Sequence, residues 1–313
     1  MFVVKYRKLF YALSAILVIA SLYAMSIWGL NPGIDFKGGS IFEIEYASST
    51  PPIQSELVSK LSILNLKESI RQTGTNGYII RMRAISQEEK TVLTNILTSN
   101  GTVKVIEKRF DSIGPVLGTE ALRKSITSII LVILAIVLFI SYAFRHVSKP
   151  ISSWKYGLVA IIALIHDVII PAGAFSILGH FKGYEVDTLF VTALLVVLGF
   201  SVHDTIVVFD RVRENLSHGA DNTKMHKEFD QIVGESIGQT FTRSINTSLT
   251  PLLALIVLYF VGGTSTQHFS LALIIGIVAG TYSSVFLGSP LLVTIWKWQE
   301  KRKMKEKGKN MIK

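Results

Sequence analysis

Six long apolar segments constrain the fold of this 313-residue chain more than any other feature. A helix needs about 20 mainly apolar residues to cross the hydrocarbon core of a membrane. Such runs lie at residues 9–30, 125–145, 157–178, 188–208, 244–262 and 269–296. Charged residues make up only 17% of the chain, whereas they make up about 25% of an ordinary soluble domain. The sequence therefore predicts a polytopic α-helical membrane protein with six transmembrane helices.

Charge in the short connecting segments predicts the orientation of these helices. Lysine and arginine in short loops favour the cytoplasmic side of a membrane. They gather before residue 9, around 145–155, around 211–227 and in the tail, whereas the loop 179–187 has one lysine against two acidic residues. We therefore expect both termini in the cytoplasm, the first helix as an uncleaved anchor, and residues 31–124 on the outer side.

The expected organisation has four parts: residues 1–30 with the first helix, an external domain at 31–124, helices two to six within 125–296, and a basic tail at 297–313. The tail holds eight basic and two acidic residues, a net charge of +6. A basic tail after an apolar segment indicates contact with the lipid bilayer surface and argues against nucleic acid as a partner. Cysteine is absent, which excludes disulfides, thiolate nucleophiles and zinc–cysteine sites.

The external segment has a pattern of its own. Strands are predicted at 41–47, 66–72, 78–83 and 103–110, with helices at 54–64 and from Ser86, which has Glu89 in capping-box position. This β-α-β-β-α-β order is the signature of an α+β ferredoxin-like domain. No catalytic constellation is evident in it, so we interpret it as a structural or peptide-contacting module.

Ionisable residues inside the apolar segments are the candidate functional residues. A charge in hydrocarbon costs about 2.5–3.5 kcal/mol on insertion scales and marks pathways and proton relays. His166 and Asp167 lie in the third segment, His203 and Asp204 in the fourth, and Arg243 opens the fifth. Residues adjacent on a helix point in different directions, so the pair at 166–167 is weaker as a site than Asp204 with Arg243.

Two polar helix faces are predicted to meet around Asp204. On the fourth helix the face comprises Ser201, Asp204 and Thr205, and on the fifth it comprises Arg243, Asn246, Thr247 and Thr250. In one interpretation the carboxyl of Asp204 takes up and releases protons beside the guanidinium. In the other, the two residues form a permanent ion pair that only locks the bundle.

Three further groups of residues are marked by type and spacing. A row of small residues on the sixth helix predicts close helix packing: it consists of Gly276, Gly280, Ser284 and Gly288. Charged residues extend the fourth helix beyond the membrane, namely Asp210, Arg211, Arg213 and Glu214. A hinge is predicted where the first helix enters the external domain, at Asp35, Phe36, Gly38 and Gly39.

Three segments resemble motifs of the SecD/SecF family of protein-export membrane proteins. The run from Gly33 to Gly39 (GIDFKGG) resembles the family signature after the first helix. The runs 201–215 (SVHDTIVVFDRVREN) and 242–250 (TRSINTSLT) resemble its SecF members in particular. His203 departs from the pattern, since the family more often has asparagine before the aspartate.

The resemblance implies membership of the resistance-nodulation-division superfamily, in the inner membrane of a bacterium. It implies an auxiliary translocase subunit without enzymatic activity that acts with SecD and SecYEG on unfolded polypeptides. Protons are the coupling ion, and neither a metal nor another cofactor is implied. Asp204 is then the proton carrier and Arg243 its partner, and the candidate relay or bundle contacts are His203, Asp167, Asn246 and Thr247.

Two alternatives remain open. The chain could be a structural subunit that holds SecD or the channel without moving protons. More remotely, Asp167 and Asp204 could be the paired carboxyls of an intramembrane aspartyl protease. Such enzymes generally have a Gly-x-Gly-Asp context, which the sequence before Asp204 lacks.

Overall fold

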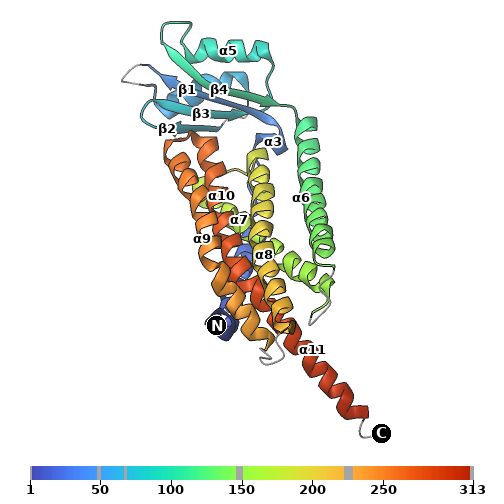
Figure 1. Ribbon diagram of the computed structural model, residues 1–313. Helices are drawn as coiled ribbons and strands as arrows, with labels where there is room; N and C mark the ends of the chain where they lie inside the picture. The colour runs from blue at the N-terminus through green and yellow to red at the C-terminus, as the bar shows by residue number, and fades with distance from the viewer. Residues whose placement is uncertain (1, 48–50, 67–68, 146–150, 222–227, 311–313) are drawn as a thin grey trace. The chain divides into compact units, whose positions relative to one another are not determined.

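The computed structural model describes residues 2–47, 51–66, 69–145, 151–221 and 228–310. The chain forms two compact units, one of Met1–Asn31 with Thr127–Lys313 and one of Pro32–Ile126 (Figure 1). The helices are α1 (Phe2–Lys5), α2 (Arg7–Trp28), α3 (Ile34–Lys37), α4 (Gln54–Leu61), α5 (Gln87–Leu97), α6 (Pro115–Ala143), α7 (Ser153–Lys182), α8 (Thr188–Asp221), α9 (Phe229–Val261), α10 (Thr264–Tyr282) and α11 (Ser289–Asn310), with short segments η1 (Ser62–Leu64) and η2 (Ser283–Gly288).

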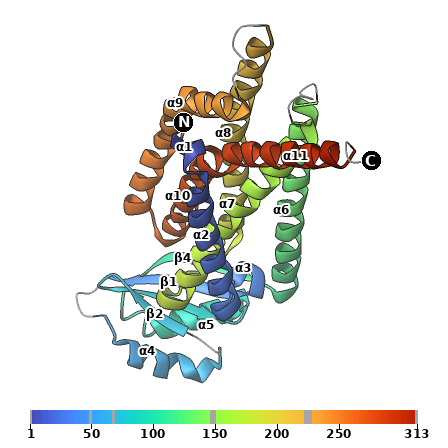
Figure 2. The ribbon, with the colours of Figure 1, turned by 90° about the horizontal axis from the view of Figure 1, so that it is seen from below.

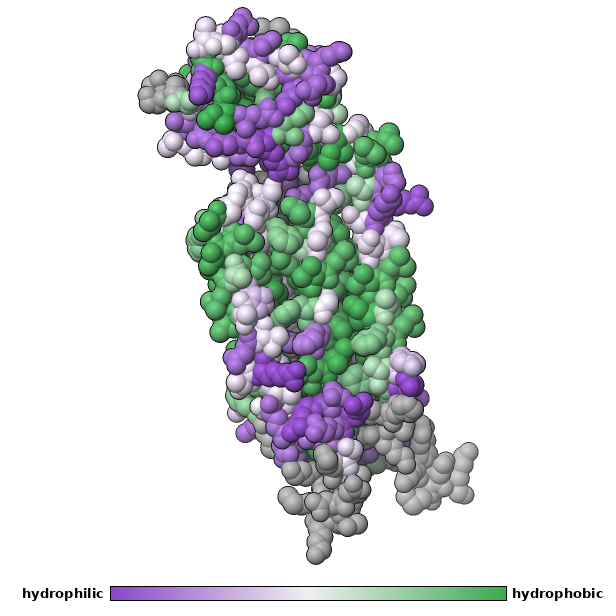
Figure 3. Space-filling view, turned by 45° about the horizontal axis from the view of Figure 1, so that its top comes forward, coloured by the Kyte–Doolittle hydropathy of each residue, from purple (hydrophilic) through white to green (hydrophobic). Residues whose placement is uncertain are grey.

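Six helical segments of the described chain are long and apolar enough to cross a membrane, which confirms the predicted number. They are Arg7–Trp28, Pro115–Ala143, Trp154–Lys182, Thr188–Ser217, Phe229–Val261 and Thr264–Lys305. On the face shown in Figure 3, apolar side chains form a broad band over these helices. Exposed leucine, isoleucine and phenylalanine side chains on α2, α6 and α9 belong to this outer surface, as expected for helices that face lipid.

The interior of the helical unit is built by α7, α8 and α10, which bury far more of their surface than α2, α6 and α9. Both α7 and α8 pack against α10, and α2 lies along α7 (Figure 2). The core between them includes the stacked rings of Phe144 and Tyr156, with Phe209 edge-on to both. These central helices therefore hold any polar side chain on their inner faces away from lipid.

The last span differs from the single predicted segment at 269–296. The helix changes to a π-helical segment, η2, between α10 and α11. Within it the backbone N–H of Ser289 donates to the carbonyl of Ser284, five residues earlier. Pro290 follows directly and lacks an N–H group, so the regular bonding pattern cannot continue unchanged there. One extra residue in a turn changes which side chains face the interior.

The second unit is built on a four-stranded antiparallel sheet that packs against α4 and α5. Its strands are β1 (Gly39–Tyr46), β2 (Ser69–Thr73), β3 (Gly77–Met82) and β4 (Val105–Ile113), in the order β2-β3-β1-β4. Because β3 lies between β1 and β2, the connection through α4 is a split βαβ unit. Phe42, Ile44 and Tyr46 alternate into a core shared with α4 and α5.

The predicted element order of this unit agrees with the structure, and the boundaries shift by a few residues. The strand predicted at 66–72 is β2, and residues 67 and 68 lie outside the described chain. The helix predicted at 54–64 ends at Leu61 and continues as η1. The capping box is confirmed: Ser86 Oγ accepts from the N–H of Glu89, whose side chain accepts from the N–H of Ser86.

Candidate functional site

Asp204 lies on the inner face of α8, where only 1% of the residue is exposed. Its Oδ2 is 3.4 Å from Ser248 Oγ on α9, and its Oδ1 is 3.9 Å from the Nδ1 of His203. The imidazole of His203 itself is 59% exposed. Asp204 is therefore a buried carboxyl whose closest partner on a neighbouring helix is a hydroxyl group.

The predicted contact between Asp204 and Arg243 is not made. Neither an ion pair nor a hydrogen bond joins these two described residues. Arg243 and Asn246 are exposed, and Thr247 bonds the carbonyl of Arg243. This face of α9 is exposed in the described chain, and Arg243 acts on Asp204 through its charge at longer range. Whether the two side chains come into contact stays a prediction. An arginine in the interior would need an ionised partner in close contact, because an unpaired buried charge is strongly destabilising.

A row of small hydroxyl residues on α9 faces the interior instead. We call it the hydroxyl row; it consists of Ser236, Thr240, Ser244 and Ser248, all buried and four residues apart. Ser248 donates to the carbonyl of Ser244 at 2.9 Å, and Thr240 donates to that of Ser236 at 2.9 Å. Ser236, Thr240 and Ser248 bond carbonyls of their own helix, and small side chains of this kind let α9 pack closely on its neighbours.

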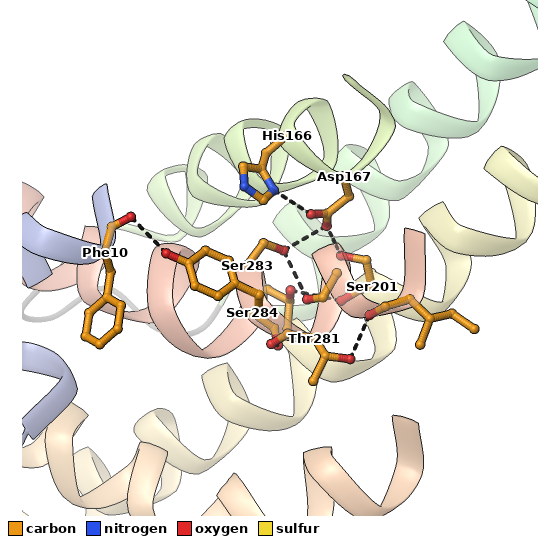
Figure 4. A network of polar contacts seen from close by, with 11 residues as sticks. Phe10, His166, Asp167, Ser201, Thr281, Ser283 and Ser284 are labelled. Carbon is orange, nitrogen blue, oxygen red and sulfur yellow. Dashed lines mark hydrogen bonds and ion pairs between the residues drawn. The ribbon is translucent and has the colours of Figure 1, made fainter. Parts of the chain in front are cut away.

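Asp167 is the most enclosed carboxyl in the helical unit, with 0% of the residue exposed. Figure 4 shows it between three elements: Nδ1 of His166 is 2.8 Å from Oδ1, and Oδ2 accepts from Ser201 on α8 and from Ser283 of η2 at 2.8 Å. The expectation that His166 and Asp167 point apart is wrong. Asp167 thus joins α7 to α8 and η2.

Hydroxyl groups lead from one carboxyl toward the other. Ser248 Oγ, beside Asp204, is 2.5 Å from Thr281 Oγ1 on α10. Two residues along from Thr281, Ser283 donates to Asp167 (Figure 4). Ser201, the other donor to Asp167, lies one helical turn before Asp204 on α8. We call these two aspartates and the side chains that connect them the carboxyl network.

Two glycines of α10 allow the close approach that this network requires. A Cβ at Gly276 would overlap the side chain of Val197 on α8, and one at Gly280 would lie 3.0 Å from Cβ of Ser201. Ser284 is buried and bonds the carbonyl of Thr281 at 3.0 Å. A Cβ at Gly288 would meet Val159 only at 3.8 Å. The close contact with α8 is therefore made by the first half of the predicted row.

The charged residues at the C-terminal end of α8 form ion pairs along their own helix. Arg211 pairs with Glu214 at 2.6 Å, and Arg213 pairs with Asp210 at 2.5 Å. Arg211 also donates to Gln239 of α9 at 2.6 Å. This end of α8 is thus fixed to α9, beyond the hydrophobic part of both helices.

The glycine signature lies in the second unit, where the backbone requires it. Gly38 and Gly39 have φ angles of 75° and 132°, values that strongly favour glycine. A Cβ at Gly38 would lie 2.8 Å from the Cα of Pro115, and one at Gly39 would lie 2.8 Å from the carbonyl of Met82. Phe36 is buried and Asp35 is half-buried in α3. Whether this turn acts as a hinge stays a prediction.

The two described aspartates of the carboxyl network are not bonded to each other. Asp167 and Asp204 share no hydrogen bond, so these described residues do not form the proton-sharing carboxyl pair of an aspartyl protease. Within the described ranges, no group of three or more histidine and acidic residues is arranged to hold a metal ion. Asp167 accepts from two hydroxyl groups, and Asp204 lies 3.4 Å from one.

Sequence reasoning missed the partners of these carboxyls. Ser283 and Thr281 lie in a run that reads as one apolar helix, and Ser248 resembles an ordinary small residue in a membrane span. The four-residue spacing from Ser236 to Ser248 is the one signal that could have indicated them, because it places hydroxyls on a single face.

Comparison with known proteins supports a role in protein export. A family model described as "Protein export membrane protein SecD/SecF, C-terminal" matches residues 92–298, and one described as "SecD/SecF GG Motif" matches residues 23–50. The chain is 44% identical to protein translocase subunit SecF of Thermobaculum terrenum, over 96% of this chain and 94% of that protein. It is 39% identical to the SecF subunit of Anaerolinea thermophila, over 96% of each.

A solved structure resembles this one over nearly the whole chain. The crystal structure of SecDF, a translocon-associated membrane protein from Thermus thermophilus, matches with a TM-score of 0.77 and 30% sequence identity. The match covers 94% of this chain but only 38% of that longer chain.

Proposed function

The chain belongs to the SecD/SecF family of protein-export membrane proteins, among the SecF subunits of protein translocases, and from this premise we propose that it couples the proton gradient to export. It does so together with SecD, at the SecYEG channel in the bacterial inner membrane, and its substrate is an unfolded polypeptide that emerges on the outer side. Protons are its only coupling ion, and Asp204 carries them.

The burial of Asp204 beside the hydroxyl group of Ser248 is the observation that carries this proposal. A charge held among membrane helices is costly, so this carboxyl gains from binding a proton. Ser248 Oγ lies near Asp204 Oδ2 and also 2.9 Å from the carbonyl of Ser244. It can therefore donate to the ionised carboxyl, or turn to its own helix when the carboxyl is protonated. Ser248 keeps a hydrogen bond in both states.

The exposed polar residues of α8 and α9 support SecD as the partner. Arg243, Asn246 and His203 are exposed on helices that otherwise have an apolar outer surface. An arginine that faces lipid is expensive, whereas one that faces another protein is paired there. We infer that helices of SecD cover these side chains and that Arg243 approaches Asp204 only in the assembled bundle. The name SecDF of the solved relative agrees with this partner.

The available energy is sufficient for the proposed coupling. One proton that crosses a potential of 100 mV supplies about 2.3 kcal/mol. That free energy shifts a two-state bundle by well over tenfold. The compact unit of Pro32–Ile126 would convert the shift into movement against the exported chain.

The topology that the proposal requires follows from the charges of the short loops. Both termini would be cytoplasmic, and the unit of Pro32–Ile126 would lie outside. A reporter fused after Lys313 should therefore lie in the cytoplasm. A reporter inserted within residues 50–100 should lie on the outer side of the membrane. An external C-terminus would overturn the proposed direction of proton movement.

The coupling itself is tested by Asp204→Asn in a bacterium that depends on this chain and its SecD for export. The amide keeps the shape of the carboxyl and cannot titrate, so the variant should accumulate in the membrane but lose gradient-dependent export. Asp210→Asn is the matched control, because Asp210 lies on the same helix, is exposed and pairs with Arg213. It should export normally.

A purely structural subunit is the alternative that this experiment addresses. A static role predicts that Asp204→Asn combined with Arg243→Ala restores export, since the double variant buries no unpaired charge. A stable double variant that remains inactive supports proton coupling. Normal export by Asp204→Asn alone would leave only the structural role.

A further inference from the structure

His166 and Asp167 form a buried pair that the proposed role of Asp204 does not use. We infer that this pair is a second proton-binding site of the bundle, which takes up one proton as a unit and is linked to Asp204 through the carboxyl network. The role of the pair in export rests on the proposed function, whereas its binding of a proton can be measured without it.

The burial of the pair provides the reason to bind a proton. His166 is 3% exposed and Asp167 is 0% exposed. With neutral His166 and ionised Asp167 the pair has one net negative charge inside the bundle. A proton added to either residue removes that net charge and retains the contact between Nδ1 and Oδ1.

An unoccupied nitrogen gives the proton a place to bind. The Nδ1 of His166 contacts Asp167, while Nε2 is buried without any hydrogen-bond partner among the described residues. If Nδ1 has the hydrogen and donates it to the carboxylate, Nε2 is a free basic nitrogen. Protonation there leaves His166 as a cation directly beside the Asp167 carboxylate. Alternatively the carboxyl takes the proton, with the same net charge.

Ser283 is able to satisfy Asp167 in both states. Its Oγ is 2.8 Å from Asp167 Oδ2 and 3.0 Å from the carbonyl of Gly280. A hydroxyl has one hydrogen and two lone pairs. It therefore donates to the ionised carboxylate, or it donates to Gly280 and accepts from the protonated carboxyl. The same choice between a carboxyl and a backbone carbonyl exists for Ser248 beside Asp204.

Few titratable groups face the pair from the neighbouring elements. On α10 the ring of Tyr282 stacks on His166, with centroids 6.1 Å apart, and its hydroxyl donates to the carbonyl of Phe10 at 2.9 Å. On α8 the titratable neighbour is Asp204, one turn beyond Ser201. On α2, Tyr11 lies within hydrogen-bond distance of Thr294 of α11. Asp204 is therefore the group whose charge most directly affects the pair.

The carboxyl network connects the two sites along two routes. Ser201 holds α8 to Asp167 one turn before Asp204, so a movement of α8 upon protonation of Asp204 alters the Ser201 contact. The second route leads from Ser248 to Thr281 at 2.5 Å and through the α10 backbone to Ser283. Protonation at one aspartate should thus change the titration of the other.

Infrared difference spectroscopy of the full chain in liposomes of neutral phospholipid tests the site. Protonated carboxyls have a C=O stretching band that appears as the pH is lowered. If the carboxyl takes the proton, Asp204→Asn should retain a buried carboxyl band that disappears in the double variant Asp204→Asn/Asp167→Asn. If Nε2 takes it, Asp204→Asn should show imidazolium ring bands at low pH that disappear in Asp204→Asn/His166→Gln. Spectra in which neither double variant differs from Asp204→Asn would overturn the inference. Normal export by Asp204→Asn would instead refute the proposed function and leave the band in place.

Substitutions at Ser283 test the site without removing Asp167 or His166, in case the Asp167→Asn variant fails to fold. Ser283→Ala keeps both members of the pair but removes the adaptable hydroxyl, so the midpoint of the Asp167 band should move by about one pH unit. Ser283→Thr keeps the hydroxyl and should leave the midpoint in place. The control is Ser270→Ala, since Ser270 is buried on α10 and its Oγ donates to the carbonyl of Thr266 at 2.6 Å. An unchanged midpoint in Ser283→Ala would contradict the proposed role of this hydroxyl.

Discussion

Close packing of α10 on α8 sets the geometry of the carboxyl network, and Gly276→Ala tests it. The added methyl group would overlap the side chain of Val197, which is 1% exposed. A valine on a helix has one strongly preferred rotamer, so it cannot turn away cheaply. Either the side chain leaves that rotamer or α10 moves away from α8. Overpacking of this kind costs about 1–3 kcal/mol.

Gly199→Ala is the matched control for this cost. Gly199 lies on α8, and a Cβ there would have no atom within 4 Å. Alanine is favoured over glycine in a helix interior by about 1 kcal/mol, and that gain applies to both variants. The free energy of unfolding of Gly276→Ala should therefore be about 1–3 kcal/mol lower than that of Gly199→Ala.

The assay is unfolding of the purified chain in bicelles, with both glycine variants in the wild-type and Val197→Ala backgrounds. Removal of the Val197 methyl groups makes room for the new alanine, so Gly276→Ala should be less destabilising in that background. The difference is the coupling energy of a double-mutant cycle and should be about 1 kcal/mol or more. Equal stabilities of the two glycine variants, or zero coupling to Val197, would refute the packing argument.

Three other perturbations have defined outcomes. Ser86→Ala removes the cap of α5 and should lower its local stability by about 1 kcal/mol, seen as faster amide exchange in its first turn. The hydrogen bond from Arg83 lowers the pKa of Glu89 from 4.5 to about 2. The ionised Glu89 therefore stabilises the fold fully above pH 4.5, and this stabilisation is lost as the pH falls through about 2. Amide exchange should show no such pH dependence in Glu89→Gln. Arg243→Lys should retain partial export with an altered pH optimum, and Arg243→Ala should lose export across the normal pH range at unchanged protein level, as pulse-labelling would show.

The membrane helices and the capping box of α5 are local features, and the sequence alone was sufficient to predict them. An apolar run of about 20 residues has few alternatives to a membrane span, because every backbone polar group must be bonded within the membrane. Ser86 and Glu89 likewise specify a helix start through their own side chains. The burial of Asp204 also followed from its position on an otherwise apolar helix.

The partners of the carboxyls could not be predicted, because they depend on how separate helices pack. The fifth membrane helix, α9, has two polar faces, and periodicity alone does not decide whether Arg243 or Ser248 points into the bundle. The π-helical segment places Ser283 beside Asp167, although the surrounding run reads as one regular helix. The side chains of His166 and Asp167 start from adjacent positions on α7 and point in different directions at first, yet Nδ1 of His166 comes within 2.8 Å of Oδ1 of Asp167.

Proton movement through Asp204 is the central claim, and a flux measurement on liposomes that contain this chain with its SecD tests it most directly. A pH gradient is imposed, and a dye inside the liposomes reports proton entry with and without an engaged export substrate. Wild type should conduct protons in a substrate-dependent manner, Asp210→Asn should match it, and Asp204→Asn should reduce the flux to that of protein-free liposomes. Wild-type flux in Asp204→Asn would contradict the account.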